Sequence, residues 1–301
     1  MAEAGYVPGT DCPLYAQLPL ANLTSYRVGG PAEHYFAPHN GADLQASLQW
    51  ACAQGLPVTV LGAGSNLLIA DRGISGLAIA TRHLRDAHFD PETGRVTVGA
   101  GKTIPSLAWQ AAKWGWQGLE WAVGIPGTVG GAVVMNAGAQ QGCVADRLVR
   151  ARLLRPDGQL EERGPEALAF AYRSSNLQGS DWVVVEATFQ LQPGAAKDTV
   201  VAATRENLQH RKRTQPYHLP SCGSVFRNPE PYAAAALIEQ LGLKGYQIGG
   251  AQIAQRHANF ILNCGDARAS DIWQLIGYIQ ERVEQRWAIR LQREVRLLGE
   301  F

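Results

Sequence analysis

Hydrophobic and polar residues alternate over several short stretches in the first half of the chain, a pattern typical of β-strands. Apolar or alternating runs predict strands at residues 58–61, 77–80, 95–98, 149–154 and 182–191. The sequence Pro-Glu-Thr-Gly at 91–94 is expected to form the hairpin turn between the second and third of these strands. Residues 1–21 are expected to form an irregular lead-in.

Helical spacing of apolar residues predicts two helices in the first half and three in the second. The first covers 43–54, with Asp43 as N-cap and Gly55 just beyond its end, and the second runs from Thr103 to Trp114. The others cover 199–213, 234–241 and a final segment capped by Ser270 or Asp271, with short strands at 251–253, 259–263 and 289–298. The turn-rich residues 193–196 mark a boundary, so the chain is predicted to be α+β with domains at 22–192 and 193–301.

Two glycine-rich loops interrupt this pattern. Residues 124–132 contain four glycines and Pro126 among apolar residues, without the Ser, Glu or Lys of a flexible linker. They predict a rigid, buried loop whose N–H groups face a phosphate or a flat ring, although a buried turn packed on a sheet would have the same composition. The second loop, Gly62-Ala63-Gly64-Ser65-Asn66, follows a strand and suits a diphosphate. It lacks the third glycine and the helix of a dinucleotide-binding fingerprint.

Two further motifs are interpreted more plainly. Residues 99–103, Gly-Ala-Gly-Lys-Thr, resemble the end of a phosphate-binding P-loop, but position 96 holds valine where that motif needs glycine. The basic residues 210–213 end a predicted helix and are expected to be a solvated terminus that suits the helix dipole.

Composition excludes several classes of protein. The 301 residues are 46% hydrophobic and 18% charged, which permits a sizeable core. A net charge of +1 argues against a nucleic-acid surface or a polybasic membrane patch. Five cysteines without framework spacing favour a reducing, cytoplasmic setting. No secretory signal and no membrane span are expected.

Six stretches in one order along the chain together resemble the UDP-N-acetylenolpyruvoylglucosamine reductase family. They are Tyr26 to Ala32, Leu61 to Leu68, Gly124 to Ala139, Tyr172 to Ser175, Gly223 to Pro229 and Glu294 to Arg296. The resemblance covers nearly the whole chain after residue 21. It implies a flavin-binding domain of the vanillyl-alcohol-oxidase type followed by a smaller α+β substrate-binding domain.

The resemblance also implies ligands. Non-covalent FAD is the expected cofactor and NADPH the hydride donor, with UDP-N-acetylglucosamine enolpyruvate as substrate in peptidoglycan synthesis and therefore in cell shape and division. The residues expected to bind FAD are Gly62, Gly64, Ser65, Asn66, Leu67, Gly124, Ile125, Pro126, Gly127, Thr128, Gly130, Gly131 and Asn136. Those expected to bind substrate are Tyr172, Arg227, Asn228 and His257. No metal site, nucleic-acid partner or membrane insertion is expected, and the chain is expected to be a monomer.

Three residues match the family's catalytic positions. Hydride added to the β-carbon of the enolpyruvyl group leaves an enolate, which needs stabilisation and then a proton. The resemblance implies that Arg173 pairs with the substrate carboxylate and that Glu294, held neutral, donates a hydrogen bond to the same carboxylate. It implies that Ser224 donates the proton. Taken singly, each has a structural alternative: an ordinary arginine, an ion-pair partner and a turn serine.

The interval between Tyr172 and Ser224 is too short for the tyrosine-bearing loop that closes over substrate in some members. This chain therefore resembles the shorter subtype, and the residues that cover its substrate stay open. Two other functions stay open as well. Another flavin-dependent oxidase or dehydrogenase would keep both glycine-rich loops, whereas a non-catalytic nucleotide-binding protein would leave them unexplained.

Overall fold

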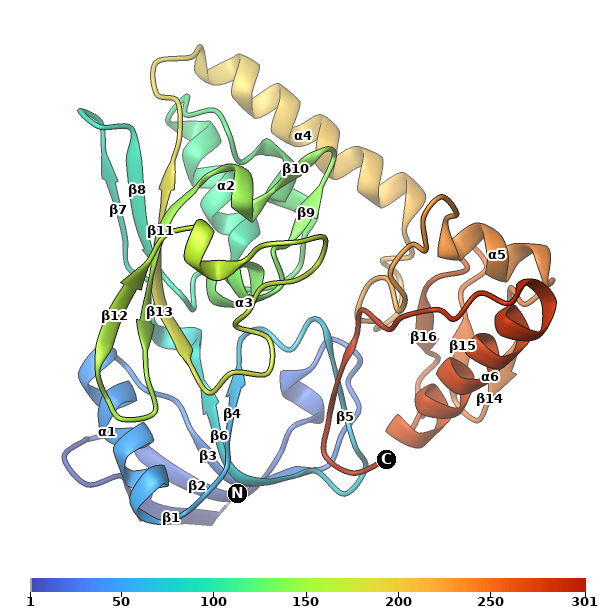
Figure 1. Cartoon of the computed structure of the whole chain (residues 1–301), viewed down its shortest axis with the longest axis horizontal. Helices are drawn as coiled ribbons and strands as arrows, with labels where there is room; N and C mark the ends of the chain where they lie inside the picture. Colours follow the sequence, from blue (N-terminus) through green and yellow to red (C-terminus); the bar gives the residue numbers. More distant parts are fainter. Residues whose placement is uncertain (1) are drawn as a thin grey trace. The chain divides into compact units, whose positions relative to one another are not determined.

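The computed structural model describes residues 2–301, which contain helices and strands in a mixed order (Figure 1). Packing divides the chain into two compact units. The first unit consists of the residues up to 16, residues 34–63 and residues 76–211. The second consists of residues 17–33, 64–75 and 212–301. Both units are thus discontinuous in sequence, whereas the domains predicted from sequence at 22–192 and 193–301 are contiguous. The assignment of FAD binding to the first domain and substrate binding to the second by these boundaries stays a prediction.

An antiparallel sheet forms the centre of the first unit. Its strand order is β12(Leu160–Arg163), β11(Leu148–Leu154), β13(Val183–Gln190), β8(Arg95–Gly99) and β7(Ala87–Asp90) (Figure 1). The turn at 91–94 connects β7 to β8. The prediction that this turn joins the strand at 77–80 to the strand at 95–98 is therefore wrong. Buried side chains of β8 and β13 share a hydrophobic core with two helices, α2(Ile104–Lys113) and α3(Val129–Val134).

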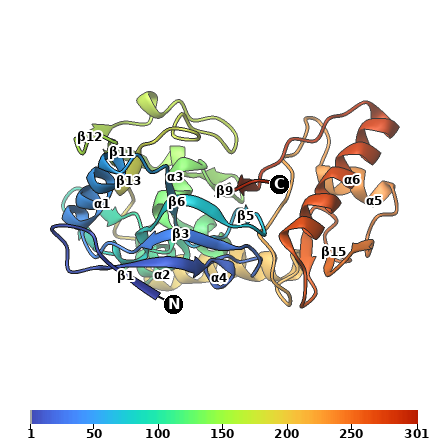
Figure 2. The ribbon, with the colours of Figure 1, turned by 90° about the horizontal axis from the view of Figure 1, so that it is seen from below.

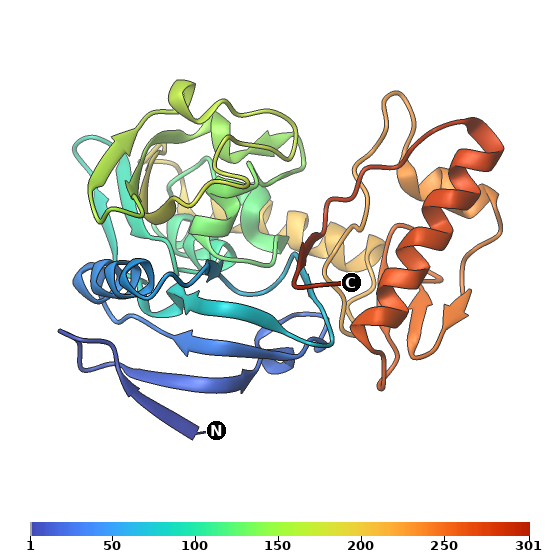
Figure 3. The same ribbon diagram turned by 60° about the horizontal axis from the view of Figure 1, so that its bottom comes forward.

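A second five-stranded sheet includes the N-terminal residues. Its order is β1(Ala2–Tyr6), β2(Pro13–Pro19), β3(Pro31–Phe36), β6(Ile74–Ala80) and β4(Val58–Leu61), and the blue strands of Figure 3 lie side by side in it. The prediction of an irregular lead-in at 1–21 is therefore wrong. These strands form because β1 pairs with β2 and β2 in turn lies beside β3, pairings that apolar spacing along the chain does not report. The helix α1(Gly41–Ala53) buries Leu44 and Leu48 against this sheet.

The second unit contains α5(Ala234–Gln240), α6(Ala269–Trp287) and a small sheet of β14(Gln247–Ile248), β15(Ala251–Ile253) and β16(Ile261–Asn263) (Figure 2). Apolar residues of α6 at helical spacing, including Ile272 and Ile276, are fully buried. The strand predicted at 289–298 is reduced to β17(Arg296–Leu298), which pairs in parallel with β5(Leu67–Ile69).

The remaining elements are short except for one long helix, α4(Lys197–Thr214). They are η1(Ala21–Leu23), η2(Thr81–His83), η3(Glu120–Gly124), η4(Val144–Asp146), η5(Glu166–Leu168), β9(Gly138–Ala139) and β10(Gly142–Cys143). All five predicted helices are present.

Two predicted caps are wrong. Asn40, not Asp43, caps α1, because its side-chain oxygen accepts the Asp43 N–H at 3.0 Å. The N-cap of α6 is Arg268, whose N–H donates to the Asp271 carboxylate, while the Asp71 carboxylate accepts the N–H groups of the first two helical residues. Asparagine and aspartate have similar capping preferences, so the sequence alone does not separate neighbouring candidates.

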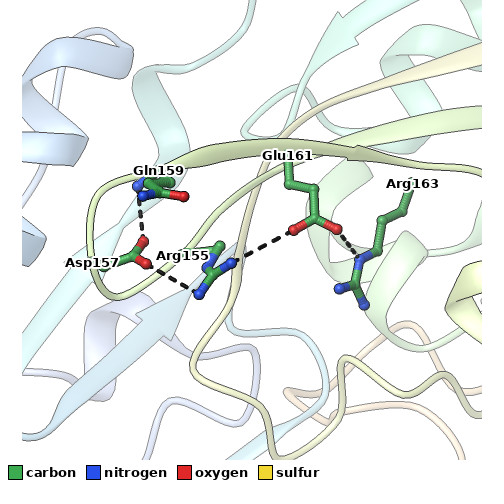
Figure 4. A network of polar contacts seen from close by, with 5 residues as sticks. All are labelled: Arg155, Asp157, Gln159, Glu161 and Arg163. Atoms are coloured by element: carbon green, nitrogen blue, oxygen red, sulfur yellow. Dashed lines mark hydrogen bonds and ion pairs between the residues drawn. The ribbon is translucent and has the colours of Figure 1, made fainter.

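Charged side chains on the hairpin of β11 and β12 form a network of polar contacts (Figure 4). Arg155 pairs with Asp157 at 3.1 Å and with Glu161 at 4.0 Å, while Arg163 pairs with Glu161 at 2.8 Å. The Arg163 guanidinium lies 4.0 Å from the centre of the Trp182 ring. Half-exposed ion pairs add little stability. We therefore interpret the network as a solvated edge of the sheet.

Candidate active site

The longer glycine-rich loop leads directly into α3. Gly127 adopts a φ of 138°, which glycine tolerates far better than other residues, and its carbonyl oxygen accepts the Ile104 N–H at 3.1 Å. The buried Thr128 caps α3, and its hydroxyl oxygen accepts the Gly131 N–H at 3.4 Å. Gly124 and Gly130 are buried as predicted, whereas Pro126 and Gly131 are exposed. The loop is thus buried only in part.

The two glycine-rich loops touch within the first unit. A Cβ atom on Gly62 would lie only 2.5 Å from the Thr128 hydroxyl oxygen, so a side chain at position 62 would push the loops apart. Gly130 approaches Ala100 in the same way, with 2.9 Å between a built Cβ and the alanine Cβ. This close backbone approach at the start of α3 fits a cradle for a phosphate or a flat ring.

Arg211 of α4 corrects the interpretation of the basic helix end. Its side chain packs against Gly124, where an added Cβ would lie 2.3 Å from the arginine Cδ, and its Nε is buried. His210, Lys212 and Arg213 are exposed, as expected of a solvated terminus. Sequence reasoning missed Arg211 because four adjacent basic residues carry the same pattern.

Asn136 links the end of α3 to the turn that carries Arg173. Its side-chain amide donates to the Ala171 carbonyl at 2.9 Å and accepts the Ala145 N–H at 3.0 Å. Both ends of the amide therefore hold protein segments. Asn136 was expected to bind FAD, and these bonds give it a positioning role in the same region.

The Arg173 turn is tied to α3 by two more side chains. Ser175 donates to the Val134 carbonyl at 2.6 Å, and Gln178 donates to the Arg173 carbonyl at 2.9 Å. Arg173 has a φ of 53°, and its guanidinium lies 5.1 Å from the ring centre of Tyr172, which is exposed. The first unit thus brings a predicted catalytic residue to the helix that follows the glycine-rich loop.

In the second unit, Asn66 and Glu294 are neighbours. The Asn66 amide donates to the Glu294 carbonyl at 3.0 Å, and the Asn66 carbonyl accepts the Arg296 N–H at 3.0 Å. Gly64, with a φ of 63°, fits beside Leu23, whose carbonyl oxygen would lie 2.0 Å from an added Cβ. The shorter glycine-rich loop is therefore joined to the segment that carries Glu294.

The Ser224 loop lies against the same segment. The Val225 carbonyl accepts the Glu294 N–H at 2.8 Å. The buried Asn259 fixes the next residue, because its amide accepts the Phe226 N–H at 2.9 Å and donates to the Phe226 carbonyl at 2.8 Å. Asn259 was not predicted as a functional residue, although a polar residue at the start of the apolar strand predicted at 259–263 was a signal for it.

A buried thiol and a buried phenol lie behind this loop. The pKa of the Cys222 thiol is raised from 9.0 to about 12, chiefly by burial and also by the nearby Glu294 carboxylate, while a hydrogen bond with the Tyr26 hydroxyl opposes the rise. Burial also raises the pKa of Tyr26 well above 10.0. Both groups stay neutral at ordinary pH, so the surroundings of Glu294 are poorly solvated on this side.

Three of the residues predicted to bind substrate, Arg227, Asn228 and His257, lie in the second unit and differ in burial and hydrogen bonding. Arg227 is half-buried, and its N–H donates to the Gln292 carbonyl at 2.9 Å. The exposed Asn228 accepts the Ala234 N–H at 3.1 Å and so helps to begin α5. Burial lowers the pKa of His257, whose ring lies 4.8 Å from that of Phe260. The predicted role of His257 in substrate binding stays a prediction.

Comparison with known proteins covers both parts of the chain. A family model for the C-terminal domain of UDP-N-acetylenolpyruvoylglucosamine reductase matches residues 215–298, and one for an FAD binding domain matches residues 32–164. The UDP-N-acetylenolpyruvoylglucosamine reductase of Nostoc punctiforme is 63% identical over 300 residues, which is 100% of this chain and 90% of that protein. The chain belongs to the UDP-N-acetylenolpyruvoylglucosamine reductase family.

Two further relatives agree with this assignment. The reductase of Synechocystis sp. is 56% identical over 97% of this chain and 93% of its own length. The crystal structure of the Thermus caldophilus reductase has a TM-score of 0.80 and 34% identity, and covers 96% of this chain and 99% of that chain. The predicted fold, a vanillyl-alcohol-oxidase-type FAD-binding domain with a smaller α+β domain, is confirmed. The protein is an oxidoreductase with an FAD-binding domain.

The roles of individual residues stay predictions. Arg173 belongs to the first unit, and Ser224 and Glu294 belong to the second. Within the described residues 2–301, we find no helix that has both the length and the hydropathy of a membrane span.

Proposed function

We propose that this reductase converts UDP-N-acetylglucosamine enolpyruvate to UDP-N-acetylmuramate with NADPH as the hydride donor, acting as a cytoplasmic monomer in peptidoglycan precursor synthesis. The family assignment supports the substrate, and the free thiols of all five cysteines agree with a reducing compartment. The choice of NADPH rests on the family resemblance alone.

The two glycine-rich loops suit FAD. The close approach of Gly62 to Thr128 and the positive φ of Gly127 leave backbone rather than side chains facing a ligand. We assign FAD binding to these loops, with Ser65 and Asn66 as additional hydrogen-bonding residues. When bound, FAD supplies hydride transfer, from NADPH in the first half-reaction and to the substrate in the second.

Three side chains manage the charge and the proton that follow. Arg173 pairs with the substrate carboxylate, where negative charge develops as hydride reaches the β-carbon. Glu294, kept neutral, donates a hydrogen bond to the same carboxylate. Ser224 donates its hydroxyl proton to the α-carbon, which is a strong enough base when the two are adjacent. Tyr172, Arg227, Asn228 and His257 are assigned to substrate binding.

The observation that carries the proposal is the connection of three predicted motifs in the second unit. Asn66 holds the Glu294 carbonyl, and the Glu294 N–H holds the carbonyl of the residue after Ser224. Asn66, Glu294 and Val225, the residue after the predicted proton donor, are thereby parts of one hydrogen-bonded set. A general acid and an electrostatic stabiliser need such fixed positions.

Anaerobic spectroscopy of the purified, FAD-loaded protein tests the proposal. NADPH is expected to bleach the flavin spectrum, and UDP-N-acetylglucosamine enolpyruvate is expected to restore it. Bleaching without recovery would keep the flavin chemistry and contradict the substrate. A protein that binds no FAD would contradict the assignment of both loops.

A further inference from the structure

Cys12, His39 and Asp43 form a cluster in the first unit, apart from every residue assigned to FAD or substrate. One atom of each side chain that can bind metal lies within 4.8 Å of the other two, and the Cys12 sulfur is 3.3 Å from an Asp43 carboxylate oxygen. Cys12 precedes β2, His39 follows β3, and Asp43 lies in the first turn of α1. The sequence predicted no metal site.

The sulfur–oxygen distance in the cluster suits tetrahedral zinc. Zinc binds sulfur at about 2.3 Å and nitrogen or oxygen at about 2.0 Å, so neighbouring ligand atoms lie roughly 3.3–3.8 Å apart. The sulfur–oxygen distance in the cluster is 3.3 Å. Cys12 is buried, whereas the His39 side chain is exposed and has room to change rotamer. A soft thiolate, an imidazole and a carboxylate are all common zinc ligands.

A second imidazole, that of His83, lies next to His39 and is the candidate for a fourth ligand. It lies in η2, and its ring centre is 5.0 Å from that of His39, with the two planes nearly perpendicular at 84°. Two imidazoles on one tetrahedral zinc ion would have ring centres about 5 Å apart. His39 is thus a neighbour both of the Cys12–Asp43 pair and of a second imidazole.

We propose that Cys12, His39, Asp43 and His83 bind one Zn²⁺ ion. The Cys12 thiol donates to the Asp43 carboxylate in this structure. On binding, a zinc–sulfur bond replaces the sulfur–hydrogen bond, the proton passes to solvent, and nothing is oxidised or reduced. The ion joins the turn before β2, the start of α1 and η2, so its role is to stabilise the N-terminal strands.

Helix capping is the competing interpretation of the same contacts. The Asp43 carboxylate also accepts the His39 N–H at 3.0 Å, as an acidic residue near a helix start commonly does. Capping accounts for Cys12 and Asp43 but uses neither imidazole. The two histidines therefore distinguish a zinc site from a cap.

Cobalt titration of the tag-free, FAD-loaded full chain tests the site. Co²⁺ bound at a tetrahedral site that includes a thiolate absorbs in the red, where flavin does not, and this absorption is called the thiolate band below. We expect one Co²⁺ per chain, displacement by Zn²⁺, and a higher melting temperature with Zn²⁺. Cys12→Ser should abolish the thiolate band, and His39→Ala and His83→Ala should each weaken binding by roughly tenfold or more.

The controls are Cys52→Ser, an exposed cysteine on α1, and His88→Ala, an exposed histidine on β7, neither of which should alter binding. Absence of the thiolate band in the native protein would overturn the proposal. So would loss of the band in Cys52→Ser, or unchanged affinity in both His39→Ala and His83→Ala. The two histidine variants remove exposed side chains, so they remain informative if Cys12→Ser fails to fold.

Discussion

The backbone N–H of Glu294 donates a 2.8 Å hydrogen bond to the carbonyl oxygen of Val225, the residue that directly follows Ser224. The two predicted catalytic residues of the second unit are therefore held on adjacent backbone segments. Asn259 fixes the other side of this segment through two hydrogen bonds to Phe226. A displacement of one catalytic group would accordingly move the other.

Ser224→Ala should separate the two half-reactions. Flavin reduction by NADPH should remain nearly native, whereas reoxidation by the enolpyruvyl substrate should slow by about 10²–10⁴-fold, the usual contribution of a positioned general acid. Anaerobic stopped-flow absorbance measures both rates. Ser221→Ala, a half-buried serine of the same loop, is the matched control. Equal slowing of both half-reactions would rule out the proton-donor role.

Asn66→Ala should loosen Glu294 without removing it. The variant loses the 3.0 Å bond to the Glu294 carbonyl, which should lower the free energy of unfolding by about 1 kcal/mol and reduce kcat for substrate reduction. Denaturant unfolding and steady-state kinetics measure the two effects. Asn176→Ala removes a comparable bond, to the Ala167 carbonyl, and should leave kcat unchanged. A native kcat in Asn66→Ala would contradict the positioning role.

Gly127→Val should expel FAD. Valine is strained at a φ of 138°, and its side chain would occupy the surface where the loop backbone is proposed to approach the cofactor. The flavin content of the purified variant, measured by absorbance, should fall severalfold or more. Gly194→Val is the control, because Gly194 has a φ of 92° in an exposed turn with open space around it. Full flavin occupancy in Gly127→Val would refute the proposed role of the loop.

Alkaline pH should destabilise the fold through Cys222. Its pKa is 9.0 unfolded and about 12 folded, so between these values the unfolded chain binds fewer protons and stability falls as pH rises. The thiol contributes a slope of up to about 1.4 kcal/mol per pH unit, a contribution that is fully present below pH 9. Denaturant unfolding from pH 8 to about 10.5 measures this slope.

Cys222→Ala removes this ionisable group and should flatten the alkaline decline, whatever its effect on stability at neutral pH. Cys52→Ala is the matched control, because Cys52 is exposed. Tyr26 titrates in the same direction at higher pH and remains in both variants. An alkaline slope that is identical in the two variants would show that Cys222 is accessible to solvent in the folded protein.

Local patterns predicted most elements correctly. The strand β4 and the helices α2 and α5 follow from apolar spacing within short stretches of sequence. The failures involve pairings between segments that apolar spacing does not report. The strands β1 and β2 depend on each other for hydrogen bonds, and the segment before β17 is held by single bonds to other segments instead of a continuous ladder.

By itself the sequence determined the two glycine-rich loops, the order of the family motifs and therefore the family, because these depend on which residues follow one another. Only the tertiary structure decided that Asn66 contacts Glu294, 228 residues away, and that Cys12 and His39 gather around Asp43. Local propensity carries no information on such pairs. They form only when packing of the whole chain offsets the entropy lost in closing long loops.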